Sequence, residues 1–298
     1  MALLGFLALP ALVVLLALLL FLRPAAPPAA GQAPPEPAAS APPAAPAGPV
    51  PEGPARVLLV TATAGFYHDS IPAARAAVER LGRATGGFTT TLVPAVADLA
   101  TVNAETLAGH DVVVFGNTTG ELPLDAAQKQ ALLDFVARGG GFLGTHSASD
   151  TFYTWPEYGR LLGAHFLEHP WTQEVTISVE DATHPATRTL GDSFSIFDEI
   201  YVFRANPRTT AAGLGGAPVH VLLSLDAASV GAAGDFPLAW CSSYGAGRVF
   251  YTALGHFDSV WEDARFQQLL LGALLWTAGR DPAPCGPALP GASPASPR

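Results

Sequence analysis

The sequence predicts an α/β domain built on a doubly wound, mostly parallel sheet with added mixed strands. Four nearly uncharged runs alternate with helical segments between residues 56 and 146, as strand and helix units do in such sheets. Polar residues follow these runs at the carboxyl ends of the expected strands, where open α/β sheets bind ligands. A hydrophobic content of 49% over 298 residues is enough for a substantial core.

The four runs are expected to be parallel strands, because segments so poor in charge are usually covered on both faces. Pro72 in the first turn marks the start of one intervening helix. Asp125 and Gln128 form a capping box at the start of another, which ends before Gly139. The strands are expected at residues 56–61, 88–96, 111–117 and 141–146.

Beyond Trp171 apolar and polar residues alternate, which indicates strands with one exposed face. A Gly-Ala-Gly turn predicts a hairpin, and a Leu-rich helix closes the domain. No linker composition intervenes, so we expect these strands to extend or cap the same sheet. The expected elements are strands 173–181, 193–203, 220–226, 238–244 and 248–254 and helix 266–278.

The two ends have a different composition. Residues 1–22 are almost entirely apolar and, at 1.5 Å per residue, long enough to span a bilayer core of roughly 30 Å. They predict a signal anchor or transmembrane helix, with a cleaved signal peptide or a misassigned start as alternatives. Residues 23–55 are a Pro/Ala-rich linker, and residues 281–298 are expected to be a disordered tail. The domain at 56–280 is then membrane-anchored or exported and extracytoplasmic, although Arg23 weakly favours the opposite orientation.

Charge and motifs exclude some partners. A net charge of −10 without a basic cluster argues against nucleic acid. No glycine fingerprint follows the first strand, so nucleotide binding is unsupported. Cys241 and Cys285 either pair in an oxidising compartment or remain a buried and a free thiol.

The segment 139–150 runs from a Gly-rich strand into a small-residue turn with His146 at its apex. In many α/β hydrolytic folds this turn presents a Ser or Cys nucleophile. Imidazole moves protons or binds metal but is a poor acyl carrier, so glutaminase activity is not expected. His68 and residues 117–119 also follow strands, so three loops converge on one mouth.

Motifs over nearly all of residues 56–280 resemble, in order, the ThuA-like (trehalose-utilisation) domain family. The resemblance implies a flavodoxin-type, class I glutamine amidotransferase-like fold with an altered nucleophile turn, and a role in sugar metabolism with 3-keto-glycosides as substrates. Phe236 stands where a His is expected and Ile200 where an aromatic is usual, which bears on specificity more than on fold. The matching motifs are His68-Asp69-Ser70, Gly139 to Phe142, Gly144-x-His146-x-Ala148-x-Asp150, Trp155-x-x-Tyr158, His169-Pro170, His184 to Thr187, Asp198-Glu199-x-Tyr201-x-Phe203, Asn206-Pro207-Arg208, Trp240, Gly247-Arg248-x-x-Tyr251 and Gly255-His256.

The resemblance also implies a polar site. Alternation along residues 193–203 places Glu199 on the site face, and Asp198 on the other face toward solvent or Arg204. An H-x-x-E-H pattern at 165–169 lacks room for a helix, so a metalloprotease is not expected. The catalytic candidates are His146, Glu199 and His68, and the substrate-binding candidates are Asp150, Tyr153, Trp155, His169, Tyr201, Arg248 and His256. The candidate ligands for a possible divalent metal such as zinc are His68, His146 and His169.

Two classes of function follow. The first is a lyase, hydrolase or isomerase that uses acid/base or metal-assisted chemistry beside the carbonyl of a keto-sugar. The second is a non-catalytic carbohydrate-binding or interaction module at the membrane surface, which would use the aromatic residues after His146. In both the partner is a sugar-like small molecule, and the membrane is contacted only through the N-terminal segment.

Overall fold

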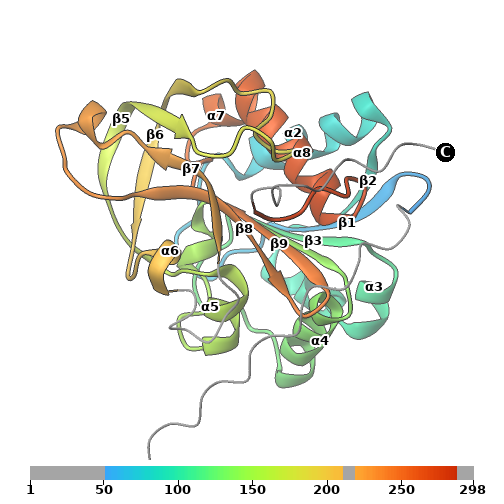
Figure 1. Ribbon diagram of the computed structural model, residues 1–298. Coiled ribbons are helices and arrows are strands. Elements are labelled where there is room, and N and C mark those ends of the chain that lie inside the picture. The colour runs from blue at the N-terminus through green and yellow to red at the C-terminus, as the bar shows by residue number, and fades with distance from the viewer. Residues whose placement is uncertain (1–50, 211–218, 287–298) are drawn as a thin grey trace, which may run out of the picture. The chain divides into compact units, whose positions relative to one another are not determined.

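The computed structural model describes residues 51–210 and 219–286 (Figure 1). The expected anchor at 1–22, the linker up to residue 50 and the tail from residue 287 lie outside the described residues. Within the described part, no helix has the length and apolar character needed to cross a membrane.

A single nine-stranded sheet carries the domain, in the order β2-β1-β3-β4-β9-β8-β7-β5-β6. The first four strands pair in parallel, as the uncharged runs predict, and β9 adds a further parallel strand beside β4. The others pair antiparallel, so the mixed extension is confirmed. The strands are β1 (Ala55–Val60), β2 (Phe88–Val93), β3 (Val112–Gly116), β4 (Gly141–Thr145), β5 (Phe166–Val179), β6 (Ser193–Phe203), β7 (His220–Leu225), β8 (Pro237–Tyr244) and β9 (Gly247–Thr252).

Helices cover both faces of the sheet (Figure 1), with α2, α7 and α8 on one side and α3, α4 and α5 on the other. The capping box forms as expected, because Asp125 and Gln128 bond each other's backbone N–H groups. The helices are α2 (Ile71–Thr85), α3 (Ala104–Ala108), α4 (Ala126–Ala137), α5 (Pro156–Leu162), α6 (Pro207–Thr210), α7 (Asp258–Glu262) and α8 (Ala264–Thr277), with short 3₁₀ turns η1 (Val96–Thr101), η2 (His146–Asp150) and η3 (Ala227–Val230).

The largest difference from expectation is the start of β5, which begins at Phe166 rather than near Gln173. Pro170 lies inside this strand. It is tolerated because β5 has register shifts between Phe166 and Trp171, and because β7 pairs with β5 only from Ile177 onward. The early part of β5 thus has one partner strand, and its residues border the mouth formed by the strand ends.

Cys241 and Cys285 form a disulfide across 44 residues of sequence. Cys241 lies fully buried in β8, while Cys285 follows α8. The disulfide therefore joins the end of the described chain to the middle of the sheet. Of the two alternatives that the sequence left open, the structure has the paired one.

Candidate functional site

His146 occupies a strained turn directly after β4. Its φ is +46°, a left-handed conformation that is uncommon for a residue with a side chain. The end of strand β4 needs Gly144, because a Cβ there would lie 2.8 Å from Leu162 and 3.1 Å from Ala148. The His146 side chain is fully buried. The turn therefore directs the imidazole inward to the strand ends instead of out to solvent.

Four side chains meet at this point: His68, His146, Glu199 and His256. One ligand-type atom from each lies within 4.8 Å of the corresponding atoms of the others. They come from the loop after β1, the turn after β4, strand β6 and the loop after β9. We call these four residues the histidine cluster. The structure brings together His68 and His146, which were expected to meet at the strand ends, with Glu199 and His256, which the family motifs indicated.

Glu199 links the cluster to a more exposed histidine. Its Oε2 lies 3.0 Å from Nδ1 of His256 and 3.7 Å from Nε2 of His146. Its Oε1 lies 3.2 Å from Nδ1 of His169, whose side chain is 50% exposed. Nε2 of His146 and Nδ1 of His256 are 3.2 Å apart. One carboxylate thus contacts three imidazoles, two within the cluster and one at its mouth.

Hydrogen bonds define which ring nitrogens face the cluster. Nδ1 of His146 lies 2.8 Å from the carbonyl oxygen of Ala253. A carbonyl only accepts, so Nδ1 carries the proton and Nε2 presents a lone pair inward. Nδ1 of His68 lies 3.3 Å from Oγ of Ser147, which leaves Nε2 as its free ring atom. The sequence alone gave Ser147 no base partner; this long bond supplies one, but Ser147 is fully buried and offers substrate no surface.

Burial keeps two of the imidazoles uncharged at neutral pH. Burial and the neighbouring His68 hold the pKa of His146 well below its usual range. Burial and the nearby His256 lower the pKa of His68 to about 4. Burial alone would also lower the pKa of His256, but its hydrogen bond to Glu199 and the carboxylate charge raise that pKa above its usual value. The cluster therefore contains neutral nitrogen lone pairs beside one carboxylate.

Asp198 holds the loop that carries His256 through hydrogen bonds to its backbone. Its carboxylate accepts hydrogen bonds from the backbone N–H groups of Gly255, at 2.8 Å, and His256, at 3.1 Å. Burial raises the pKa of Asp198 to about 7, although these N–H groups act in the opposite direction. Asp198 thus faces a buried loop instead of solvent or Arg204 as the sequence predicted. Glu199 contacts the imidazole of the same His256 whose backbone Asp198 binds.

Asn117 fixes the other side of the same loop. Its side-chain amide donates to the carbonyl oxygen of Gly255 at 2.9 Å and to Oγ of Ser70 at 3.1 Å. Trp261 donates to the same carbonyl at 2.9 Å. Asn117 follows β3 with a φ of +52° and is fully buried. It acts as a positioning residue, and its place at a strand end was the only sequence signal for that role.

The remaining sequence candidates lie in different surroundings. Tyr201 packs against the His146 ring at 4.2 Å. Tyr153 donates to Asp150 at 2.5 Å and has the Arg204 guanidinium over its ring at 4.0 Å. Burial raises the pKa of the Asp150 carboxyl. Both Tyr153 and Asp150 thus belong to a partly buried polar group after η2.

Trp155 and Arg248 are not brought to the cluster. Trp155 is only 6% exposed and packs against Phe152 and Tyr158 in the core. Arg248 lies at the amino end of β9, where it donates to the carbonyl oxygens of Trp276 and Asp281. The cluster is at the carboxyl end of the same strand. Neither side chain is positioned to contact a molecule at the histidine cluster.

Exposed aromatic residues border the cluster, and the sequence analysis did not identify them. Phe66 is 65% exposed and Phe197 is 50% exposed. A row of neighbouring rings crosses the site between them. The Phe66 ring packs against His68 with a centroid distance of 4.9 Å, and His68 lies 5.2 Å from His256. Phe257 lies 4.5 Å from His256 and 5.4 Å from Phe197. We call Phe66, Phe197 and Phe257 the aromatic rim.

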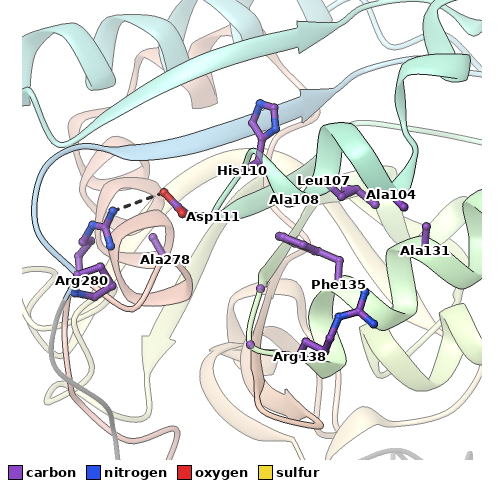
Figure 2. A pocket seen from close by; sticks show the side chains of 13 residues that line it. Ala104, Leu107, Ala108, His110, Asp111, Ala131, Phe135, Arg138, Ala278 and Arg280 are labelled. Carbon is purple, nitrogen blue, oxygen red and sulfur yellow. Dashed lines mark hydrogen bonds and ion pairs between the residues drawn. The ribbon is translucent and has the colours of Figure 1, made fainter.

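A separate hollow of about 330 Å³ lies at the opposite end of the sheet (Figure 2). Phe135 and Arg138 line one side, and Arg280 lies 3.4 Å from Asp111 on the other. Asp111 and Gly140 precede β3 and β4, so this hollow is at the amino ends of the parallel strands. It contains none of the residues of the histidine cluster.

The fold and the turn define the class: an amidotransferase-like α/β protein with histidine in place of the nucleophile. More particularly, the chain belongs to the ThuA (trehalose utilisation) family, whose model matches residues 56–277. No curated protein matches the chain. Among solved structures, a putative ThuA-like protein from Bacteroides uniformis is 26% identical, with a TM-score of 0.63 over 76% of this chain and 93% of that chain.

A second putative ThuA-like protein, from Parabacteroides merdae, is 20% identical, with a TM-score of 0.61 over 76% of this chain and 90% of that chain. A β-galactosidase from Bacillus circulans sp. alkalophilus has a TM-score of 0.50 and 18% identity, over 77% of this chain and 32% of that chain. At these identities the two likenesses concern the fold alone.

Proposed function

We propose that the domain acts on the carbonyl group of a keto-sugar, with 3-keto-glycosides as the substrate class, and that it does so outside the cytoplasm. One observation carries the proposal: Glu199 lies between a buried group of histidines and the half-exposed His169, with one oxygen facing each. Within the buried group, His256 can donate a hydrogen bond to negative charge on oxygen, because Glu199 raises its pKa despite its burial. The exposed histidine can exchange protons with solvent. Membership of the ThuA (trehalose utilisation) family supports a sugar as the substrate.

The chemistry starts at the carbon next to the ketone. His169 is the base, because a carboxylate beside its Nδ1 favours the proton there and leaves Nε2 free to accept another. The bonding pair of the broken C–H bond moves into an enolate, whose oxygen accepts a hydrogen bond from His256, the cluster imidazole whose pKa Glu199 raises despite burial. The enolate then expels the glycosidic oxygen on the next carbon, which takes up a proton, or is reprotonated to give an isomer. Neither outcome needs an oxidant or a covalent intermediate.

The aromatic rim supports a sugar ring as the ligand. Sugar sites combine apolar ring surfaces with a few placed polar groups. Phe66 lies one ring away from His68, and Phe197 is joined to His256 through Phe257. A pyranose stacked on the rim would hold its ketone near the cluster. This surface replaces Trp155, which is buried, as the candidate platform.

The location is proposed from two features of the chain. The Cys241–Cys285 disulfide is a type of bond that persists in oxidising compartments. Residues 1–22 have the composition of an anchor, followed by a Pro/Ala spacer. Together they favour a domain held off the outer surface of a membrane.

The test is turnover of a 3-keto-glucoside against the parent glucoside by the full chain. His146→Asn is the decisive variant, because Asn tolerates left-handed backbone and removes the ring nitrogens. We expect a fall in kcat/KM of about 100- to 10,000-fold. His110→Asn, at the far hollow, is the control and should turn over normally. Unchanged turnover in His146→Asn would refute the proposal, and sugar binding without any turnover would favour a carbohydrate-binding module.

A further inference from the structure

We infer that His68, His146, Glu199 and His256 bind one divalent transition-metal ion, with zinc as the first candidate. Three imidazoles and one carboxylate are donors that suit this ion. The inference does not require a sugar substrate, since it rests on the positions and orientations of the four side chains. It assigns His256 and Glu199 as ligands and places His169, a candidate from the sequence, outside the ligand set.

The spacing of the donor atoms fits a shared ion. Two atoms bound to one tetrahedral ion at about 2.1 Å lie about 3.4 Å from each other. In the cluster, His256 Nδ1 is 3.0 Å from Glu199 Oε2 and 3.2 Å from His146 Nε2. Glu199 Oε2 is 3.7 Å from His146 Nε2. The donor atoms of His146, Glu199 and His256 are therefore already near the separations that ligands adopt around an ion, and the donor atom of His68 lies within 4.8 Å of all three.

The second nitrogen of two rings is held as it is in metal sites. Ligating histidines usually bond their other ring nitrogen to a carbonyl, carboxylate or water, which fixes the ring and its tautomer. His146 does so with the Ala253 carbonyl at 2.8 Å, and His68 with Ser147 at 3.3 Å. Both bonds use Nδ1 and leave Nε2 as the donor to a metal. A purely structural histidine needs no such orientation toward two other imidazoles.

Glu199 is held through its second oxygen, and His256 is held through its backbone. His169 lies 3.2 Å from Oε1 of Glu199, so Oε2 remains for the ion. Asp198 accepts from the backbone N–H of His256 at 3.1 Å and fixes its loop. The Tyr201 ring packs on the His146 ring with a centroid distance of 4.2 Å. All four ligands are thus supported by neighbours that do not face the ion.

The experiment measures metal content of the full chain, purified in mild detergent, loaded with Zn²⁺ and dialysed. We expect one zinc per chain by elemental analysis and, after replacement by Co²⁺, visible absorption bands from the cobalt. His146→Asn and His256→Ala should each weaken zinc binding by more than about 100-fold, since loss of an outer partner alone costs about 10- to 100-fold. Two variants are used so that the test remains valid if one of them misfolds. Circular dichroism checks that each variant is folded.

His110→Ala is the matched control and should retain one zinc per chain, while His169→Ala removes only an outer partner of Glu199 and should weaken zinc binding less than loss of a ligand does. Absence of zinc in the loaded wild type would overturn the inference, as would full retention in a folded His146→Asn or His256→Ala variant. Loss in His169→Ala with retention in His256→Ala would overturn the assignment of ligands. The zinc contents do not depend on whether the protein turns over keto-glycosides. The experiment therefore tests the metal site independently of the proposed function.

Discussion

Glu199 holds His169 through one carboxylate oxygen, with Oε1 at 3.2 Å from Nδ1, while its other oxygen faces the histidine cluster. This arrangement separates the half-exposed His169, which can exchange protons with solvent, from the buried imidazoles of the cluster. Replacing His169 by Gln keeps a polar side chain but removes the base. We expect kcat for a 3-keto-glucoside to fall by about 100-fold or more while KM changes little.

Steady-state kinetics on His169→Gln and on Glu168→Gln, an exposed neighbour, checks this prediction. The Glu168 variant should behave as wild type. A His169→Gln enzyme with normal kcat would show that another group moves the proton.

Two substitutions of His146 distinguish the structural role of its backbone from the chemical role of its imidazole. With φ at +46°, this position accepts Asn more readily than a β-branched residue. His146→Val should lower the free energy of unfolding by about 1–3 kcal/mol relative to His146→Asn, and both should lose turnover. Urea denaturation of the two variants measures the difference. Equal stability would mean that the strained backbone relaxes.

The aromatic rim should act on binding rather than on chemistry. Phe66→Ala removes an exposed ring that touches only the edge of His68, so KM for the keto-glycoside should rise about 10-fold with kcat nearly unchanged. Val96→Ala, an exposed apolar residue outside the rim, is the control. A rise in KM of similar size in both variants would argue against the rim as a sugar platform.

His184 should make the domain sensitive to acid. It is 2% exposed, its Nε2 has no hydrogen-bond partner in the described part of the chain, and burial lowers its pKa to about 4. A depressed folded pKa means that the stabilisation is fully present above the unfolded value of about 6.5 and is lost as pH falls toward 4. Between pH 7 and pH 5 the loss from this group is about 2 kcal/mol.

Urea unfolding of wild type and His184→Asn at both pH values tests this. Asn can still accept the Ala186 N–H bond that His184 receives at 3.2 Å, so the variant should fold. Its stability should decline less between pH 7 and pH 5. An identical decline would locate the acid sensitivity in other buried histidines.

The disulfide should contribute stability by restricting the unfolded chain. It closes a 44-residue separation between Cys241 and Cys285, and such a bond contributes about 2–4 kcal/mol. Cys285→Ala, outside the fully buried core, should therefore lower the denaturation midpoint, and reductant should have no further effect on that variant. If reductant does not shift the wild type, the two cysteines are not joined in solution.

The parallel half of the sheet could be predicted because its strands carry almost no charged residues on either face. This property can be read from each short segment by itself. The strands after Trp171 were predicted, but their order in the sheet was not. No local pattern near β9 shows that this strand pairs with β4. No local pattern near Pro170 shows that β5 has a single partner strand there and can accept proline. Trp155 and Arg248 illustrate the same limit. Their residue types suit sugar binding, but burial and strand direction place them elsewhere.

By itself, the sequence determined the α/β class, the histidine at the apex of the strand-to-helix turn and the convergence of loops at one edge, because each follows from local pattern and from strand direction. Family motifs added Glu199 and His256. Only the tertiary structure decided that these side chains meet at ligand distances, that Asp198 and Asn117 fix the loop between them, and that Phe66 and Phe197 border the site. Those contacts join distant segments of the chain, such as Asp198 and Gly255, 57 residues apart, and Asn117 and Gly255, 138 residues apart. No local pattern encodes a contact that is set by the packing of the whole sheet.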